Sequence, residues 1–248
     1  LTANTTADNN TAVGKAALTA NTTGTGNVAV GSGTSDANTD GDYNVAVGNG
    51  ALGSDTRGNF STGIGHGALN SQNTTNDTDM YNTAVGYLAG TLVTTGIQNT
   101  LIGGLAGDAL TDADRNVALG YGALTLDTLG SRTVALGFGS LQSQNFTSAT
   151  DSYNTAVGYN SGAAITTATG STLIGGLSGD AITTGANNTA VGSSSLGANT
   201  TGTQNTALGT QALLNNTTAN DNTAVGMNAL FANTTGTQNV AVGSLAGD

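Results

Sequence analysis

The sequence predicts an all-β protein, a parallel β-solenoid (β-roll) of about fourteen seventeen-residue coils, and three observations predict it. The phrase Asn-(Thr/Val)-Ala-(Val/Leu/Ile)-Gly recurs fourteen times with few exceptions. Its closing glycines are evenly spaced, as from Gly14 to Gly31, except for two steps that are four residues longer. A unit this short cannot enclose a core alone, so it must stack on its neighbours. The composition, with no Glu and only four Lys and Arg residues, disfavours long helices because these are the usual helix formers on a protein surface.

We call the closing residues of the phrase the signature glycines and predict that they are structural and lie in one column. They are Gly14, Gly31, Gly48, Gly65, Gly86, Gly103, Gly120, Gly137, Gly158, Gly175, Gly192, Gly209, Gly226 and Gly243. The unbroken repeat predicts that residues 1–248 form a single domain. At ~4.8 Å per coil, the coils would stack into a rod roughly 65–70 Å long.

The three residues before each signature glycine, such as 28–30, predict a short strand. The first and third are β-branched or apolar and share one face, whereas the second is nearly always Ala and lies on the other. Such a pattern predicts burial on both faces, one inside the coil and one against another sheet or another chain. The alternative is that Ala only suits a cramped bend.

A second apolar piece follows each glycine. Leu lies four residues on at Leu18, Leu52, Leu69, Leu124, Leu141, Leu196, Leu213 and Leu230. In four coils Leu lies two residues on instead, with glycine in the vacated place: Leu88, Leu105, Leu177 and Leu245, with Gly90, Gly107, Gly179 and Gly247. Because positions two apart on a strand share a face, we expect either position to fill one interior volume. The coils with Ser35 and Gly162 lack both leucines, and we expect weaker packing there.

The rest of each coil is predicted to be turn. Six copies carry Asn-Thr-Thr, which begins at Asn4, Asn21, Asn73, Asn199, Asn216 and Asn233. Stacked Asn side chains can hydrogen-bond in a ladder, and we favour this role over N-glycosylation of the same sequon because the triplets have a fixed phase.

The two long coils carry four extra residues at the same phase, near 70–81 and 142–153. We expect them to bulge as loops, which are common contact sites in repeat proteins. A neutral insertion duplicated with its block is the alternative.

Composition excludes several classes of function. The net charge of −11 argues against nucleic-acid binding, which requires clustered Lys and Arg. No apolar run approaches the ~20 residues that span a membrane. No cysteine is present, so there is no disulfide framework.

No enzyme, cofactor or metal site is predicted. The segment 48–53 matches a dinucleotide-binding glycine pattern but lacks the helix that this pattern needs. The segments 103–108 and 175–180 are similar to calcium-binding nonapeptides without their tandem spacing. Acidic residues that could bind a cation are interpreted as solvated turn carboxylates: Asp36, Asp40, Asp42, Asp77, Asp79, Asp112 and Asp114. His66, the only histidine, is interpreted as a surface residue.

The phrase Asn-Thr-Ala-Val-Gly followed by Ala-Leu, as in Asn222–Gly226 with Ala229-Leu230, resembles the head repeats of YadA-like trimeric autotransporter adhesins and related phage tail-fibre repeats. The likeness covers essentially the whole chain. It implies a left-handed β-roll, three chains side by side, and an adhesive or fibrous role outside the cell. The adhesin heads use a shorter coil, nearer fourteen residues. This difference in coil length puts in question the cross-section, the handedness and the trimer.

The expected function is that of a structural fibre or shaft, extracellular, at the cell surface or on a virion, and homo-oligomeric as a trimer or a head-to-tail filament. The alternative is a carbohydrate-binding adhesin head or a tail-fibre receptor-binding segment that meets a surface glycan or cell receptor. Its candidate contacts are Tyr81, Tyr87, Tyr153, Tyr159 and the long loops. A carbohydrate-cleaving spike and an ice-binding threonine face are more distant alternatives.

Overall fold

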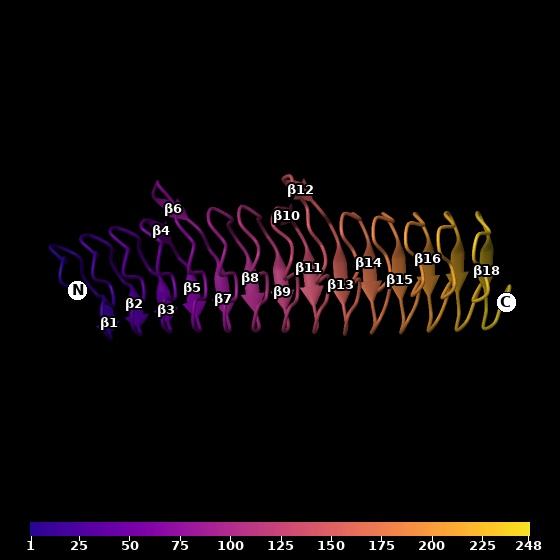
Figure 1. Cartoon of the computed structure of the whole chain (residues 1–248), viewed down its shortest axis with the longest axis horizontal. Helices are drawn as coiled ribbons and strands as arrows, with labels where there is room; N and C mark the ends of the chain where they lie inside the picture. The colour runs from indigo at the N-terminus through magenta and orange to yellow at the C-terminus, as the bar shows by residue number, and fades with distance from the viewer. The chain divides into compact units, whose positions relative to one another are not determined.

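A computed structural model describes all 248 residues and contains no helix. Two compact units make up the chain, unit 1 (Leu1–Tyr121) and unit 2 (Gly122–Asp248). Within each unit the chain winds through successive coils whose strands lie side by side (Figure 1). Seven of the fourteen coils belong to each unit, which confirms the predicted all-β parallel solenoid.

Unit 1 is built on a parallel sheet of three-residue strands. Its members, in order, are β1 (Thr11–Val13), β2 (Val28–Val30), β3 (Val45–Val47), β5 (Thr62–Ile64), β7 (Thr83–Val85), β8 (Thr100–Ile102) and β9 (Val117–Leu119). A separate two-stranded parallel sheet pairs β4 (Gly58–Asn59) with β6 (Thr78–Asp79).

Unit 2 repeats this arrangement. Its sheet contains β11 (Val134–Leu136), β13 (Thr155–Val157), β14 (Thr172–Ile174), β15 (Thr189–Val191), β16 (Thr206–Leu208), β17 (Thr223–Val225) and β18 (Val240–Val242). Its two-stranded sheet pairs β10 (Gly130–Ser131) with β12 (Thr150–Asp151).

Within each unit, every three-residue strand pairs with the next at the same phase of the repeat. Ala12 pairs with Ala29, and Ala135 with Ala156 across the longer coil. The main chain then continues the ladder beyond the strands, as where the Gly31 amide donates to the Val13 carbonyl at 2.8 Å. Because every coil offers its neighbour the same donors and acceptors, stacking satisfies backbone groups that a lone coil would leave open.

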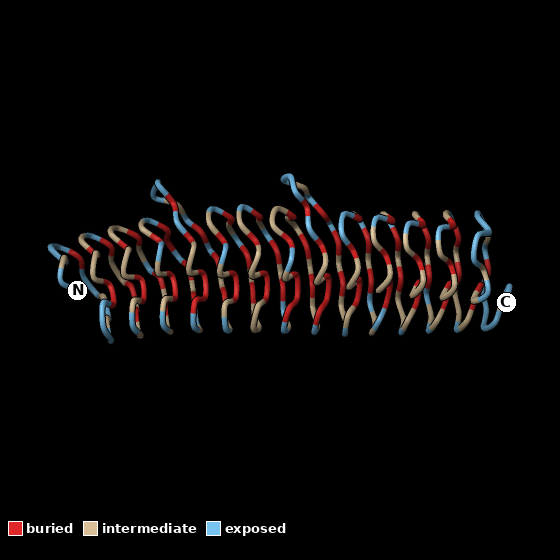
Figure 2. The backbone as a smooth tube through the Cα atoms, viewed as in Figure 1, coloured by how far each residue is buried: buried red, intermediate tan, exposed pale blue.

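The strand's alanine face is the interior. Ala29, Ala46, Ala156 and Ala190 are fully buried, while the β-branched residues on either side of each alanine point outward and stay partly exposed. Figure 2 shows buried and exposed segments alternating along each coil. The narrow coil explains the alanine, because a larger side chain would meet the opposite wall. Only one of the two strand faces is therefore covered by the chain itself.

The structure corrects the expectation about the leucines. Leucines four residues after the glycine are buried, such as Leu52 and Leu124, but those two residues after it are not: Leu177 is 37 % exposed and Leu245 is 54 % exposed. This segment is a turn, and both positions adopt positive φ, +49° at Leu52 and +57° at Leu177. The rule that alternate residues share a face applies to extended strands, so it fails here.

The vacated interior volume is filled from two other places. In unit 1, Leu101 replaces the strand alanine, and a Cβ on Gly90 would lie 2.6 Å from Leu101 Cδ1. Val93 and Leu110, which occupy the turn where other coils have Asn, are fully buried beside it.

In unit 2, Leu173, Ile165 and Ile182 do the same around Gly162 and Gly179. The expected weak packing at Gly162 is therefore wrong, because its missing leucine is compensated.

All fourteen signature glycines adopt φ between +125° and +141°. A Cβ on Gly48 would also lie 2.5 Å from the Gly65 carbonyl oxygen in the next coil. Glycine is required here on two grounds, the backbone conformation and the close approach of the neighbouring coil.

Two columns of Asn side chains hold successive coils together. In the first, the Asn44 amide donates to Asn27 Oδ1 and Asn27 Nδ2 donates to the Gly41 carbonyl, both at 2.8 Å. In the second, Asn38 Nδ2 donates to Asn21 Oδ1 of the preceding coil at 3.4 Å and to the Gly41 carbonyl of its own turn at 3.0 Å. Asn21, the Asn of an Asn-Thr-Thr triplet, is buried and bonds in the same way to Gly24. These contacts confirm the ladder role for such buried asparagines.

Candidate functional surface

The outward face of each sheet is apolar. The residue before each signature glycine, which we call the outer apolar column, is always Val, Leu or Ile. Well inside the units these side chains remain partly exposed, for example Ile64, Ile174 and Leu208. Main-chain ladders align them, because Val30 pairs with Val47 and Val191 with Leu208. Each unit therefore presents a regular strip of apolar side chains to its surroundings.

Aromatic side chains stack in two further columns. The residue just before the signature Asn position forms the pre-strand column, and the residue just after each signature glycine forms the post-strand column. In the pre-strand column of unit 1, Tyr43, Phe60 and Tyr81 stack with centroid separations of 5.5 and 5.3 Å and nearly parallel planes. In the post-strand column His66 stacks on Tyr87 at 5.5 Å. These are favourable offset-stacking distances, set by the spacing of the coils.

Unit 2 has a related arrangement. Phe138 stacks on Tyr159 in the post-strand column at 5.6 Å. In the pre-strand column the Arg132 guanidinium lies over the Tyr153 ring at 5.9 Å and is ion-paired with Asp151. Stacking of a cation on a ring holds the tyrosine in a defined orientation.

The four tyrosines predicted as contacts are all exposed: Tyr81, Tyr87, Tyr153 and Tyr159. They do not form one cluster. Tyr81 and Tyr87 lie in different columns, one at each end of β7, as Tyr153 and Tyr159 do around β13.

The hydroxyls of two of them bond to loop carboxylates. Tyr81 donates to Asp79 Oδ2 at 3.2 Å, and Tyr153 to Asp151 Oδ2 at 3.3 Å. The Asp79 carboxylate raises the pKa of Tyr81.

Sequence reasoning missed the stacking partners Tyr43, Phe60 and Phe138, and it interpreted His66 only as an ordinary surface residue. The signal was available, because aligning the coils on their glycines places every aromatic residue except Phe146 and Phe231 at one of two phases.

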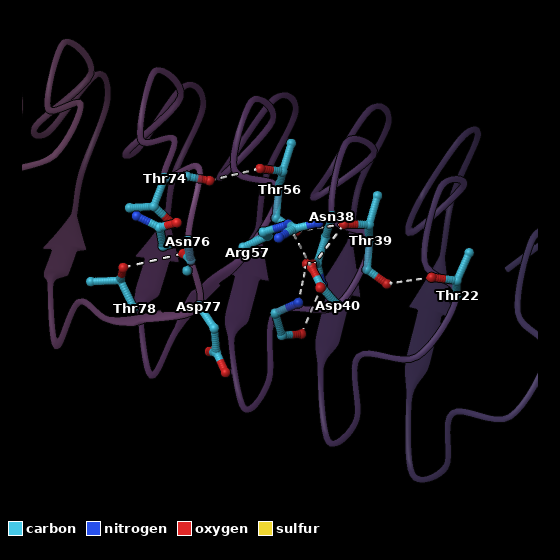
Figure 3. Close-up of polar contacts among 12 residues, drawn as sticks. Thr22, Asn38, Thr39, Asp40, Thr56, Arg57, Thr74, Asn76, Asp77 and Thr78 are labelled. Carbon is cyan, nitrogen blue, oxygen red and sulfur yellow. Dashed lines mark hydrogen bonds and ion pairs between the residues drawn. The ribbon is translucent and has the colours of Figure 1, made fainter.

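The long coils form the predicted loops, which extend beyond the neighbouring coils of their own units near β6 and β12 (Figure 1). Polar contacts brace the first loop (Figure 3). Thr56 Oγ1 donates to the Thr74 carbonyl at 2.9 Å, and Thr78 Oγ1 to the Asn76 carbonyl at 3.1 Å. Asp77 Oδ1 accepts a hydrogen bond from Asn59 Nδ2 at 2.5 Å. The loop tip at Thr75–Asp77 is exposed, and its base is held by the preceding coil.

Threonines of the short coils form a column of their own in Figure 3. Thr22 Oγ1 donates to the Thr39 carbonyl, and Thr39 Oγ1 donates to the Thr56 carbonyl, both at 3.0 Å. These hydroxyl protons are committed to the solenoid's own ladder.

A buried polar network underlies each long loop. In unit 1, Gln72 Nε2 donates to Asp55 Oδ2 and, at 3.0 Å, to Ser61 Oγ. Gln72 Oε1 accepts from Asn82 Nδ2 at 2.9 Å, and Asp55 Oδ1 accepts from the Gly58 amide at 2.9 Å. Burial raises the pKa of the Asp55 carboxyl, although its hydrogen bonds oppose the shift.

Unit 2 carries the same network with one substitution. Gln144 Nε2 donates to Asp127 Oδ2 at 2.6 Å and to Thr133 Oγ1 at 3.1 Å. Asn154 Nδ2 donates to Gln144 Oε1 at 2.9 Å. At the turn position where many short coils have asparagine, the long coils have glutamine, and its longer side chain reaches the carboxylate of the preceding coil. The network therefore occurs only with a long coil.

No enclosed pocket is present, and no group of three or more His, Asp or Glu side chains is placed to hold a metal ion. Nor is any helix long and apolar enough to cross a membrane. Comparison of the chain with protein-family models, with curated proteins and with solved structures found no match.

Proposed function

We propose that the protein is a structural fibre or shaft segment, outside the cell or on a virion, whose copies associate side by side as a homotrimer. The observation that carries the proposal is the outer apolar column, a strip of aligned Val, Leu and Ile side chains left uncovered by the chain itself. Contiguous apolar patches on a soluble protein commonly mark interaction surfaces. The resemblance to trimeric adhesin and tail-fibre repeats supports the number three, left-handed winding and the extracellular location.

Light scattering coupled to size exclusion tests the assembly. We expect a mass three times the 24.0 kDa of the chain. The double variant Val191→Lys/Leu208→Lys places two charges in the outer apolar column and should give monomers with an unchanged β-type circular dichroism spectrum. Thr184→Lys/Thr201→Lys adds the same charge at exposed turn positions and should remain trimeric. A wild-type protein that is monomeric at micromolar concentration contradicts the proposal.

Electron microscopy of the same sample provides a second test. We expect elongated particles. If copies of the protein also associate head to tail, some particles should contain two copies joined end to end. Compact globular particles contradict a fibre role whatever the mass.

A second candidate function is carbohydrate binding, as in an adhesin head or a receptor-binding segment of a fibre. It is favoured by the exposed Tyr81, Tyr87, Tyr153 and Tyr159, since an exposed tyrosine combines an apolar face with a hydroxyl. Glycan-array binding should be reduced when these tyrosines are replaced by alanine, and trimer mass should not change. An array with no bound glycan contradicts this candidate and leaves the fibre role standing.

A further inference from the structure

Large side chains in the pre-strand and post-strand columns occur in the same coils. Each of the five post-strand rings shares its coil with a pre-strand aromatic residue or arginine. These coil partners are Phe60 with His66, Tyr81 with Tyr87, Arg115 with Tyr121, Arg132 with Phe138 and Tyr153 with Tyr159. Tyr43 is the one pre-strand ring without such a partner, because its coil has Asn49. In another coil both columns have glycine, Gly170 and Gly176. The bulk of the two columns therefore varies together.

Within one chain the two columns lie at opposite ends of the strands. Tyr81 precedes β7 and Tyr87 follows it, and an extended segment of three residues spans about 10 Å. Both rings are exposed, 50 % at Tyr81 and 58 % at Tyr87, and the two columns flank the outer apolar column. Duplication of a block of coils repeats residues within each column but does not match one column to the other. A surface that meets both columns coil by coil accounts for the match.

A ring of parallel copies provides such a surface. When a rotation about a common axis relates the copies, each copy presents one edge of its apolar face to the opposite edge of the next copy. The pre-strand column of one copy then lies beside the post-strand column of its neighbour. Because the rotation leaves every coil at its own height along the axis, each coil meets the same coil of the neighbour. An antiparallel pair would instead bring like columns together.

We propose that the pre-strand column of each copy packs against the post-strand column of the next copy, coil for coil, an inference that rests on the proposed trimeric fibre. In unit 1 the Tyr81 ring then contacts the Tyr87 ring of the next copy, so that two exposed stacks cover each other. In unit 2 the Arg132 guanidinium meets the Phe138 ring of the next copy as a cation–π contact. The exposed rings thereby become part of an interface, where aromatic residues and arginine are enriched.

The two columns also specify the register between copies, which the outer apolar column does not. That column has Val, Leu or Ile in every coil, so a shift by one coil would leave it covered. The same shift places Tyr81 opposite Gly104 in one direction and Tyr159 opposite Gly170 in the other. Within each unit, only the coil-for-coil arrangement gives every post-strand ring an aromatic residue or arginine as its partner. The correct register is selected by the contacts that a wrong register loses.

Disulfide trapping tests the arrangement, since the chain has no cysteine of its own. The double variant Tyr81→Cys/Tyr87→Cys is treated with oxidised glutathione, which accepts the electrons of the two thiols. We expect covalent dimers and trimers on a non-reducing gel, because coil-for-coil contact brings the two Cα atoms within about 7 Å, the limit for a disulfide. Tyr81→Cys alone and Tyr87→Cys alone should not be cross-linked. Tyr153→Cys/Tyr159→Cys repeats the test in unit 2.

Tyr43→Cys/Tyr87→Cys is the matched control. It removes one tyrosine from each of the same two columns, but the two positions are two coils apart, about 9.6 Å along the axis. This variant should not be cross-linked. Light scattering and circular dichroism of the reduced variants check that each keeps the trimer mass and the wild-type spectrum.

Three results would overturn the inference while the fibre function stands. The first is a trimer in which neither double variant of a single coil is cross-linked. The second is cross-linking of a single-cysteine variant, which shows that like columns meet. The third is faster cross-linking of Phe60→Cys/Tyr87→Cys than of Tyr81→Cys/Tyr87→Cys, which shows a shift by one coil. If the wild-type protein is monomeric, the inference and the proposed function fail together.

Discussion

Leu101 lies where Gly90 leaves room for it: a Cβ on Gly90 would be 2.6 Å from Leu101 Cδ1. The two residues belong to neighbouring coils. Glycine at position 90 makes room for leucine at position 101, and this leucine fills the space that the glycine leaves. Where the turn carries Leu, the facing strand carries Ala or Gly, and where the turn carries Gly, the strand can carry Leu. Interior volume is thus conserved across coils and not within one.

Exchange of this pair should reveal their coupling. Leu101→Ala is expected to destabilise the protein by about 2–5 kcal/mol through the cavity it creates. Gly90→Leu should cost about 1–3 kcal/mol through overpacking. The double variant should be less destabilised than the sum, by at least about 0.5 kcal/mol, in urea unfolding followed by circular dichroism. Gly90→Leu combined with Leu196→Ala in unit 2 is the control, and additivity in both double variants would contradict the shared volume.

The signature glycines should not tolerate a methyl group. Gly48→Ala combines φ of +127° with a clash against the Gly65 carbonyl, and a loss of about 2–4 kcal/mol is expected in thermal or urea unfolding. Gly176→Ala is the matched control, because its Cβ meets nothing and its φ is not positive. The control should change stability by less than about 0.5 kcal/mol. Equal effects of the two substitutions would contradict a column of closely approaching coils.

Asp55 should make stability depend on pH. Its pKa is raised by burial, whereas in the unfolded chain a carboxyl titrates near about 3.9. The folded state therefore binds the proton more tightly, and this contribution is present at acid pH and lost as pH rises through the raised pKa. Asp55→Asn should be more stable than wild type near pH 7 and less dependent on pH above about 4.

The asparagine can fit this position because Asn38 occupies the same column and bonds to Gly41 in the same way. Asp55→Ala leaves Gln72 without its partner and should be destabilised at every pH, which distinguishes loss of charge from loss of the hydrogen bonds. A steeper acid-side dependence in Asp55→Asn than in wild type would contradict the assignment.

The pre-strand stack should contribute to stability although it is exposed. Phe60 contacts rings on both sides, and Phe60→Ala is expected to cost about 1–2 kcal/mol in urea unfolding. Gln98→Ala is the control, since it has the same phase and a φ of +61°, close to the +57° of Phe60. A cost no greater than that of the control would show that the stack is incidental to folding.

The repeat made the strands and the glycines predictable. One backbone position must accommodate the same neighbour in each coil, so the requirement at Gly48 appears again wherever the phase returns. Asn ladders followed from the same periodicity, because a side chain that bonds to its equivalent in the next coil must recur there.

The turn was not predictable by the same reasoning. Leu52 and Leu177 were placed on a common strand face, but both have positive φ in a tight turn, and only Leu52 points inward. Left-handed conformations at non-glycine residues are unfavourable locally and persist only because stacking imposes them. The local sequence therefore does not predict them.

Tyr43 and Phe60 were missed for a different reason. Each looks like an isolated surface aromatic along the sequence, and they become partners only when successive coils are superposed on their signature glycines.

Leu101 occupies space left by two glycines, Gly90 in the coil before and Gly107 in its own, and Leu173 does the same for Gly162 and Gly179. The packing of each of these coils therefore depends on its neighbour. If recombination between coils lengthened or shortened the gene, the protein would keep its packing only where the crossover left each leucine together with its two glycines. A change in length by whole blocks of four coils, the interval that separates Gly14 from Gly86 and Gly86 from Gly158, would keep every such group intact.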